Sequence, residues 1–221
     1  MALGTGNQFP LQEFPISAEQ LRRSGCREGE RALPLTPRGV TATALTVAAV
    51  AESRQALTCW TELLPFEIEL APDKIRLYLK EINAPASVRE AWAALQARGL
   101  PWKERYTKHA RIEFAGESAS VARPVEMGMD VILDSGLGPI RSGDPLVFQV
   151  LRDGQPLAGL AVELRSDRVR VGLWMKTDAQ GRVRVKAPLP GRWVLRGTDL
   201  RLSETDTWES RFVALAFEVG K

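Results

Sequence analysis

Residues 142–217 read SGDPLVFQVLRDGQPLAGLAVELRSDRVRVGLWMKTDAQGRVRVKAPLPGRWVLRGTDLRLSETDTWESRFVALAF. Short runs of alternating apolar and polar residues are separated by Asp-Gly, Gln-Gly and Pro-Gly dipeptides, of which Asp153-Gly154 is the clearest tight turn. Short alternating strands between such turns are typical of antiparallel β-sandwiches. The stretch therefore predicts a mostly-β fold built on a sandwich.

Seven strands are predicted over the last hundred residues or so, which matches a sandwich of immunoglobulin or transthyretin-like architecture. In Arg182–Lys186 the valines are expected to face inward and the charged residues outward, which fixes the register of that strand. The predicted strands lie near residues 128–134, 145–152, 159–166, 168–176, 182–187, 192–199 and 210–219.

The first part of the chain is also predicted to be rich in strands, with two short helices inserted. Phe66–Leu70 alternates strictly and predicts a half-buried strand with its three apolar side chains on one face. The apolar period then becomes helical near 72–82, where Pro72 suits a first helical turn. A second helix is predicted near 87–98, because Ser87 and a glutamate three residues later form a capping box.

Two features near the ends of these elements bear on domain organisation. Ser17–Gln20 resembles a capping box, and either a single helical turn or a plain extended strand follows from it. Gly116–Arg123 is poor in apolar residues and is expected to be a boundary. We therefore predict two sandwich-like domains, residues 1–121 with the two helices and residues 122–221 with the seven strands.

The charge balance argues against a nucleic-acid partner. The 221 residues include 30 Lys and Arg against 27 Asp and Glu, for a net charge of +3, and the two signs are interleaved. A nucleic-acid-binding protein would instead gather its basic residues on one face. No apolar run approaches the roughly 18 residues of a membrane-spanning helix, so we expect no membrane insertion, and Ala42–Ala51 is interpreted as a buried strand.

Cys26 and Cys59 are the two cysteines. Both fall in predicted strands of the first domain. They are expected either to form one disulfide that closes a loop of about 30 residues or to remain two separate buried thiols.

The residues suggest no catalytic or cofactor chemistry. His109 is the one histidine, so any Ser-His-Asp triad or nickel or cobalt site would depend on it, and it lies among lysines and arginines. Ser210 lies between bulky residues on a predicted strand, without the Gly-x-Ser-x-Gly turn of hydrolases. Glu67 and Glu69 are the one local pair of carboxylates on a strand face. We expect no enzyme activity, no bound metal and no cofactor.

Aromatic residues supply the remaining candidate surface. Trp193 is expected in the core, whereas Trp208 lies in a polar setting and is expected at a surface or a domain seam. Trp208 and Glu209 together with Tyr78 or Tyr106 are the candidate interdomain or ligand-binding groove. His109 is expected in a surface or interdomain role.

Several segments resemble one bacterial family of domains of unknown function. They are DGQPLAGLAVEL, KTDAQGRVRV, GRWVLRG and DTWESRFVALAFEV in the second half, and GTGNQFP, FEIELAPDKIRLYLKEI and KERYTKHARIEF in the first. Members of that family are often labelled periplasmic components of a nickel or cobalt ABC uptake system. The second-half segments are also similar to transthyretin-like and carboxypeptidase-regulatory-like modules.

The resemblance implies an exported, periplasmic or secreted protein, whereas the opening residues Met-Ala-Leu-Gly-Thr-Gly by themselves contain no signal peptide. We expect the signal peptide and a first strand with the family's usual histidine to precede Met1. The expected function is that of a non-enzymatic binding or accessory protein linked to nickel or cobalt uptake, with transport components or a small ligand as partner. The alternatives are a carbohydrate- or protein-binding surface module and an enzyme with its site between the domains.

Overall fold

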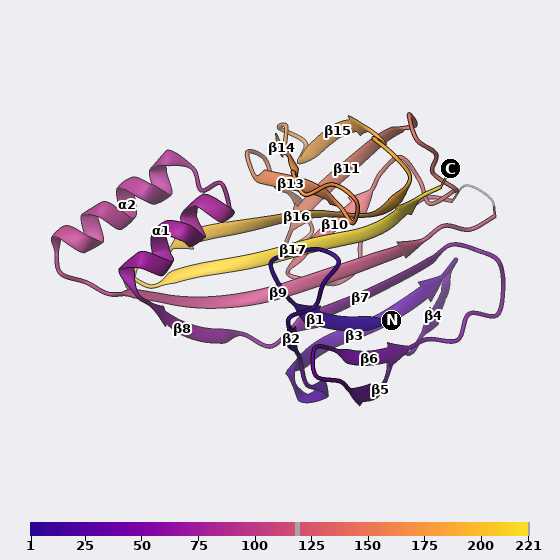
Figure 1. The fold of residues 1–221 in the computed structure, drawn as a ribbon, viewed down its shortest axis with the longest axis horizontal. Helices are drawn as coiled ribbons and strands as arrows, with labels where there is room; N and C mark the ends of the chain where they lie inside the picture. The colour runs from indigo at the N-terminus through magenta and orange to yellow at the C-terminus, as the bar shows by residue number, and fades with distance from the viewer. Residues whose placement is uncertain (118–119, 221) are drawn as a thin grey trace.

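The computed structural model describes residues 1–117 and 120–220, and one large sheet runs through both halves of the chain (Figure 1). Eight of its strands follow one another in space, and a ninth, β8 (Phe66–Leu70), pairs with the beginning of β9. In spatial order the eight are β14 (Leu173–Lys176), β13 (Ala161–Ser166), β16 (Gly191–Leu202), β17 (Trp208–Val219), β9 (Trp102–Phe114), β7 (Leu57–Leu63), β3 (Leu21–Glu28) and β4 (Arg31–Leu33).

Strands β17 and β9 join the two predicted domains. They pair in parallel from Trp208 beside Glu104 to Ala216 beside Ile112, whereas their other neighbours in the sheet are antiparallel. The expected C-terminal sandwich is therefore not closed on itself, because its edge continues into a strand of the first half. Composition alone indicated a connecting segment near residue 121, but it carries no information on which strands pair across that segment.

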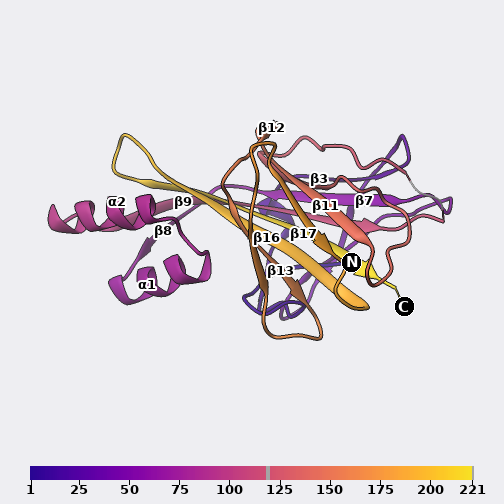
Figure 2. The ribbon, with the colours of Figure 1, turned by 90° about the horizontal axis from the view of Figure 1, so that it is seen from above.

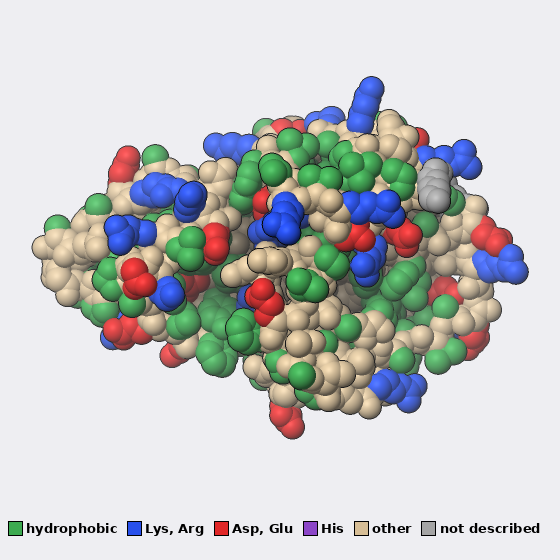
Figure 3. Space-filling view, viewed as in Figure 1, with side chains coloured by type: hydrophobic (Ala, Val, Ile, Leu, Met, Phe, Trp, Pro, Cys, Tyr) green, Lys and Arg blue, Asp and Glu red, His purple; other side chains and the backbone are tan. Residues whose placement is uncertain are grey.

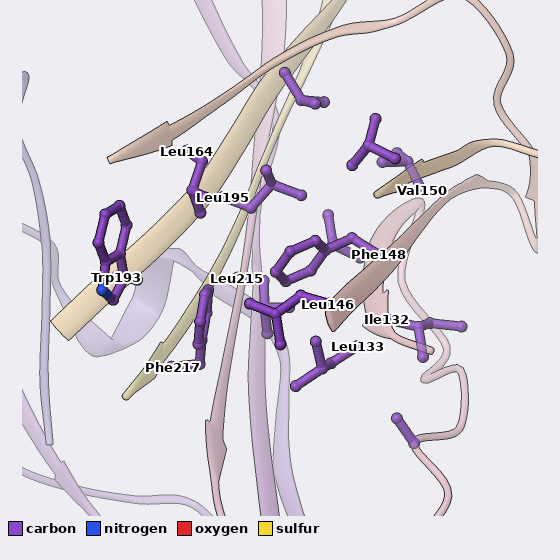
Figure 4. Close-up of a cluster of buried hydrophobic side chains, with 14 of the residues drawn as sticks. Ile132, Leu133, Leu146, Phe148, Val150, Leu164, Trp193, Leu195, Leu215 and Phe217 are labelled. Atoms are coloured by element: carbon purple, nitrogen blue, oxygen red, sulfur yellow. The ribbon is translucent and has the colours of Figure 1, made fainter. Parts of the chain in front are cut away.

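A second sheet packs on one face of the large sheet and completes a sandwich. Its strands are β10 (Met129–Leu133), β11 (Pro145–Arg152), β12 (Gln155–Pro156) and β15 (Arg182–Lys186). Figure 4 shows the core between the sheets, where Phe148 of β11 lies 5.4 Å from Phe217 of β17, measured between ring centroids. The predicted core residue Trp193 belongs to this cluster.

A third sheet covers the opposite face near β3 and β7. Its strands are β2 (Phe14–Pro15), β1 (Ala2–Thr5), β6 (Leu45–Ala48) and β5 (Thr36–Val40). The faces differ because side chains alternate along a strand: Leu215 packs in the first core, whereas Ile112, paired with the next residue Ala216, packs in this one. A disulfide joins Cys26 and Cys59 in this core, with 4.0 Å between their Cα atoms.

Two helices lie on this same face at the far end of the large sheet, α1 (Pro72–Glu81) and α2 (Ala86–Ala97). Ile75 and Leu79 of α1, together with Trp92 of α2, pack against Leu200 and Trp208 of the sheet. Figure 2 shows that both helices extend beyond the sandwiches at one end of the molecule. Neither helix has the length and apolar character that a membrane crossing requires, among the described residues.

The mostly-β prediction with sandwich layers and two helices is confirmed, as are six of the seven C-terminal strand positions to within three residues, whereas the strand predicted over 168–176 is limited to Leu173–Lys176. Ser17 and Gln20 do form a capping box, on the short 3-10 helix η1 (Ala18–Gln20). The buried strand expected over 42–51 is shorter, since β6 spans Leu45–Ala48. The strand predicted over Phe66–Leu70 is confirmed as β8, but the burial expected of its apolar face is wrong, since Phe66 and Ile68 are 51% and 40% exposed and no sheet within the described ranges covers them.

Candidate ligand-binding site at the helical end

Strand β9 carries different polar groups on its two faces, because consecutive side chains point to opposite sides. Trp102, Glu104 and Lys108 share the face that the helices cover at one end, and His109 and Arg111 share the face that packs toward β10. The first group lies beside a pocket.

Glu104 is the centre of the polar network under α1, and it is only 3% exposed. Oε1 accepts a hydrogen bond of 2.9 Å from the hydroxyl of Tyr78 on α1 and another from the hydroxyl of Ser210 on β17. Oε2 accepts a hydrogen bond of 2.8 Å from Nε1 of Trp102. A buried carboxylate is stable only when its oxygens are satisfied, so these three donors together hold a helix and two strands in one geometry.

The same side chains form an aromatic cluster. The rings of Trp102 and Trp208 stack with 4.6 Å between centroids, and Trp92 of α2 meets Trp102 edge-on at 5.2 Å. Tyr78 also meets Trp102 edge-on, at 6.0 Å. The cluster joins residues of α1, α2, β9 and β17, so the end of the large sheet and the helical layer form one packed unit.

A pocket of about 520 Å³ opens beside this cluster. It lies between the two helices on one side and, on the other, the end of β8 and the beginning of β9. Ile75 and Trp102 lie beneath it at 0% exposure and Trp92 at 7%, so the surface that a ligand would meet comes from the more exposed lining residues. Trp102 therefore connects the two features: its ring lies beneath the pocket, while its Nε1 donates to Glu104. The lining residues are Glu69, Leu70, Ala71, Pro72, Ile75, Trp92, Gln96, Gly99, Leu100, Pro101 and Trp102.

Lys108 lies two residues beyond Tyr106 on the same face of β9. Its Nζ is 4.5 Å from the ring centroid of Phe212 and 5.5 Å from that of Tyr106. Burial lowers the pKa of the Lys108 amine, and the negative charge of Glu104 opposes this shift. Burial, followed by the charge of Glu104, raises the pKa of the Tyr78 hydroxyl, so this hydroxyl stays protonated and serves as a donor.

The opposite face of β9 contains His109, which is 3% exposed. Its Nδ1 donates to the carbonyl oxygen of Phe212 at 3.0 Å, and its Nε2 lies 3.9 Å from Oε2 of Glu62. Burial lowers the pKa of His109, which favours the neutral ring. The backbone N–H of Gly128 donates to the same Glu62 oxygen, so the segment leading to β10 is attached at this point.

Arg111 continues this buried network. Its Nε lies 2.5 Å from Oε1 of Glu113, and its Nη1 lies 2.9 Å from Oδ2 of Asp130 on β10. Thr58 donates to the second oxygen of Glu113 at 2.6 Å. Burial raises the pKa of both carboxyl groups, and the charge of Arg111 opposes that shift. These groups hold β7, β9 and β10 together, so their role is to stabilise the packing of the two sheets.

Residues 84–198 match the family described as a domain of unknown function, DUF4198, and this match covers just over half of the chain. The chain belongs to the DUF4198 family. No curated protein matches the sequence. The DUF4198 match begins just before α2 and ends within β16, so it includes Trp92, Trp102 and Glu104 but not Tyr78 or Trp208.

The residues that sequence reasoning singled out do not form one groove. Tyr78, Tyr106 and Trp208 lie on the helix-covered face, whereas His109 and Glu209 point to the other side of the sheet. Trp208, the first residue of β17, is fully buried against the helices and Trp102 of β9, so it lies at a seam between elements and not at the surface. No group of three or more potential metal-ligating side chains occurs among the described residues.

Sequence reasoning missed Glu104, Lys108 and Phe212, and it considered Ser210 only as a nucleophile. The alternation Trp102, Glu104, Tyr106, Lys108 within the DUF4198 segment was the available signal, because it places these side chains on one strand face. The parallel pairing of β9 with β17, which brings Ser210 to Glu104, has no signal in the sequence pattern.

Proposed function

We propose that this DUF4198 protein is a non-enzymatic binding protein of an oxidising compartment, which takes a small, mostly apolar ligand in the pocket at the helical end. The pocket of about 520 Å³, which lies over the buried side chains of Ile75, Trp92 and Trp102, is the observation that carries the proposal. Pockets of this size lined by apolar and aromatic side chains are the usual form of a small-molecule site.

The polar network next to the pocket supports binding in preference to catalysis. Glu104 accepts hydrogen bonds from Tyr78, Trp102 and Ser210, so its oxygens are engaged within the protein. The Ser210 hydroxyl is itself a donor to Glu104, and it has no histidine beside it, since His109 lies on the other face of the sheet. A preorganised network of this kind holds Trp102 in place beneath the pocket.

The disulfide between Cys26 and Cys59 supports the exported location, periplasmic or secreted. Both cysteines are buried in the core beneath the third sheet, at 0% and 2% exposure. Disulfides persist in secreted and periplasmic proteins and are rare where thiols are kept reduced.

The test uses N-phenyl-1-naphthylamine, a neutral apolar dye whose fluorescence rises on transfer from water. We expect saturable binding that Gln96→Trp weakens about tenfold or more, because Gln96 lines the pocket and the larger ring fills it. Glu90→Trp is the matched control, since Glu90 is an exposed residue of the same helix outside the pocket. Equal dye affinity in both variants, or no saturable binding, would contradict the proposal.

A role beside a nickel or cobalt uptake system is a second proposal, which rests on the resemblance of the quoted segments; the disulfide agrees with the exported location that this role implies. It is tested by thermal unfolding of the protein with excess NiCl₂ or CoCl₂. An increase in melting temperature at saturating metal, abolished by His109→Gln, would support direct metal binding. No increase at saturating metal would contradict direct metal binding by this chain.

A further inference from the structure

Strand β8 is an open edge of the large sheet. Within the described ranges it pairs with β9 alone, from Phe66 beside Tyr106 to Leu70 beside Trp102. In Figure 1 it runs below β9 at the lower left, apart from the other strands. Every other N–H and C=O of an edge strand points away from its one neighbour, so β8 presents unpaired backbone groups on its outer side.

The side chains of β8 are exposed on both faces. Phe66 and Ile68 are 51% and 40% exposed on the helix-covered side, and Leu64 just before them is 49% exposed. Figure 3 shows hydrophobic side chains gathered at the surface in the region where Figure 1 places β8. Glu67 and Glu69 are exposed on the other face.

The pairing of β8 with β9 shows which side chains are compatible with a strand beside β8. On β9, Arg105 lies opposite Glu67 and Lys103 lies opposite Glu69. On the other face, the ring of Tyr106 lies 5.6 Å from that of Phe66. Directly opposed pairs of this kind stabilise antiparallel strands, and a strand added on the free side would face the same pattern of acidic and apolar residues.

We propose that the outer edge of β8 binds an extended segment of a partner protein in which lysine or arginine alternates with apolar residues. Main-chain hydrogen bonds to β8 would hold the segment in the sheet. Its basic side chains would lie beside Glu67 and Glu69, and its apolar side chains would lie beside Phe66 and Ile68. This surface is separate from the proposed use of the pocket, although Glu69 and Leu70 also line that pocket.

A second copy of this chain suits the edge less well. Pairing β8 with β8 of another copy would place four glutamates on one face, and like charges opposite one another are destabilising. Strand β15 has the basic pattern Arg182–Lys186, but Arg182 and Arg184 already form ion pairs with Asp134 and Asp178. The charge pattern therefore favours a separate basic segment.

The test measures binding of a fluorescein-labelled peptide, Lys-Val-Lys-Val-Lys-Val-Lys, to the full chain by anisotropy at physiological salt. We expect Glu67→Lys to weaken binding about fivefold or more and Glu81→Lys, an exposed control on α1, to change it by less than about twofold. A peptide N-methylated at every residue keeps the charges but has no backbone N–H to donate along either edge, and its binding should be lost.

Three results would overturn the proposal. The first is equal binding of the methylated peptide, which would show attraction by charge alone. The second is an equal effect of Glu67→Lys and Glu81→Lys, which would place the peptide elsewhere. The third is concentration-dependent self-association of the protein that Glu67→Lys and Arg184→Glu each abolish, which would make a second copy the occupant.

Discussion

The hydroxyl of Tyr78 on helix α1 donates a hydrogen bond of 2.9 Å to the carboxylate of Glu104 on strand β9. Because Glu104 also accepts from Trp102 and Ser210, this bond attaches α1 to two strands that come from different halves of the chain. The wall of the pocket therefore depends on a polar contact made in the interior of the protein.

Removing this hydroxyl should destabilise the protein. Tyr78→Phe leaves the ring in the aromatic cluster but takes one donor from a buried carboxylate, which costs about 1–3 kcal/mol. The measurement is the free energy of unfolding in urea. Tyr106→Phe is the control, since the Tyr106 ring contacts Phe66 and Phe212 at the edge of the same cluster. A loss no greater than that of the control would show that the bond is not formed in solution.

Stability should fall as the pH is lowered from about 7 to 5.5, through His109. Burial lowers the folded-state pKa of His109 below its ordinary value of 6.5, so the unfolded chain binds the proton first. The stability that this residue contributes is present above the unfolded pKa and is lost as the pH falls toward the folded pKa, with a limiting slope of about 1.4 kcal/mol per pH unit.

The measurement is the unfolding free energy of the protein and of His109→Gln across this pH range. The variant should have the shallower dependence, because glutamine does not titrate. Identical slopes would assign the pH dependence to other groups and would indicate that His109 is accessible to solvent.

Reduction of the Cys26–Cys59 bond should also destabilise the protein. The two residues are 33 positions apart, so opening the bond releases a loop of that length in the unfolded state. The chain-entropy relation gives a loss of about 3–4 kcal/mol. Dithiothreitol should lower the free energy of unfolding of the protein. The double variant Cys26→Ser/Cys59→Ser should be less stable than the oxidised protein, and dithiothreitol should not change its stability. A loss of stability of the double variant in dithiothreitol would contradict this, because the variant has no disulfide to reduce.

The sequence was informative wherever structure is local. The turn at Asp153-Gly154 and the helical period after Pro72 predicted a β11–β12 reversal and helix α1 correctly, because both depend on neighbouring residues. The exposure of Phe66 was not predicted, since alternation shows which residues share a face but not whether another layer covers that face. The Glu104 network was missed for a similar reason, because parallel pairing between β9 and β17 is non-local.

The central structural claim is that β9 and β17 belong to one sheet, so that residues before and after the predicted boundary form a single cooperative unit. Native-state hydrogen exchange of the backbone amides in Trp102–Phe114 and Trp208–Val219 tests it most directly. Shared pairing predicts opening free energies that agree within about 1 kcal/mol between the two strands. Strong protection of Trp208–Val219 that persists while Trp102–Phe114 exchanges several kcal/mol more easily would contradict the claim.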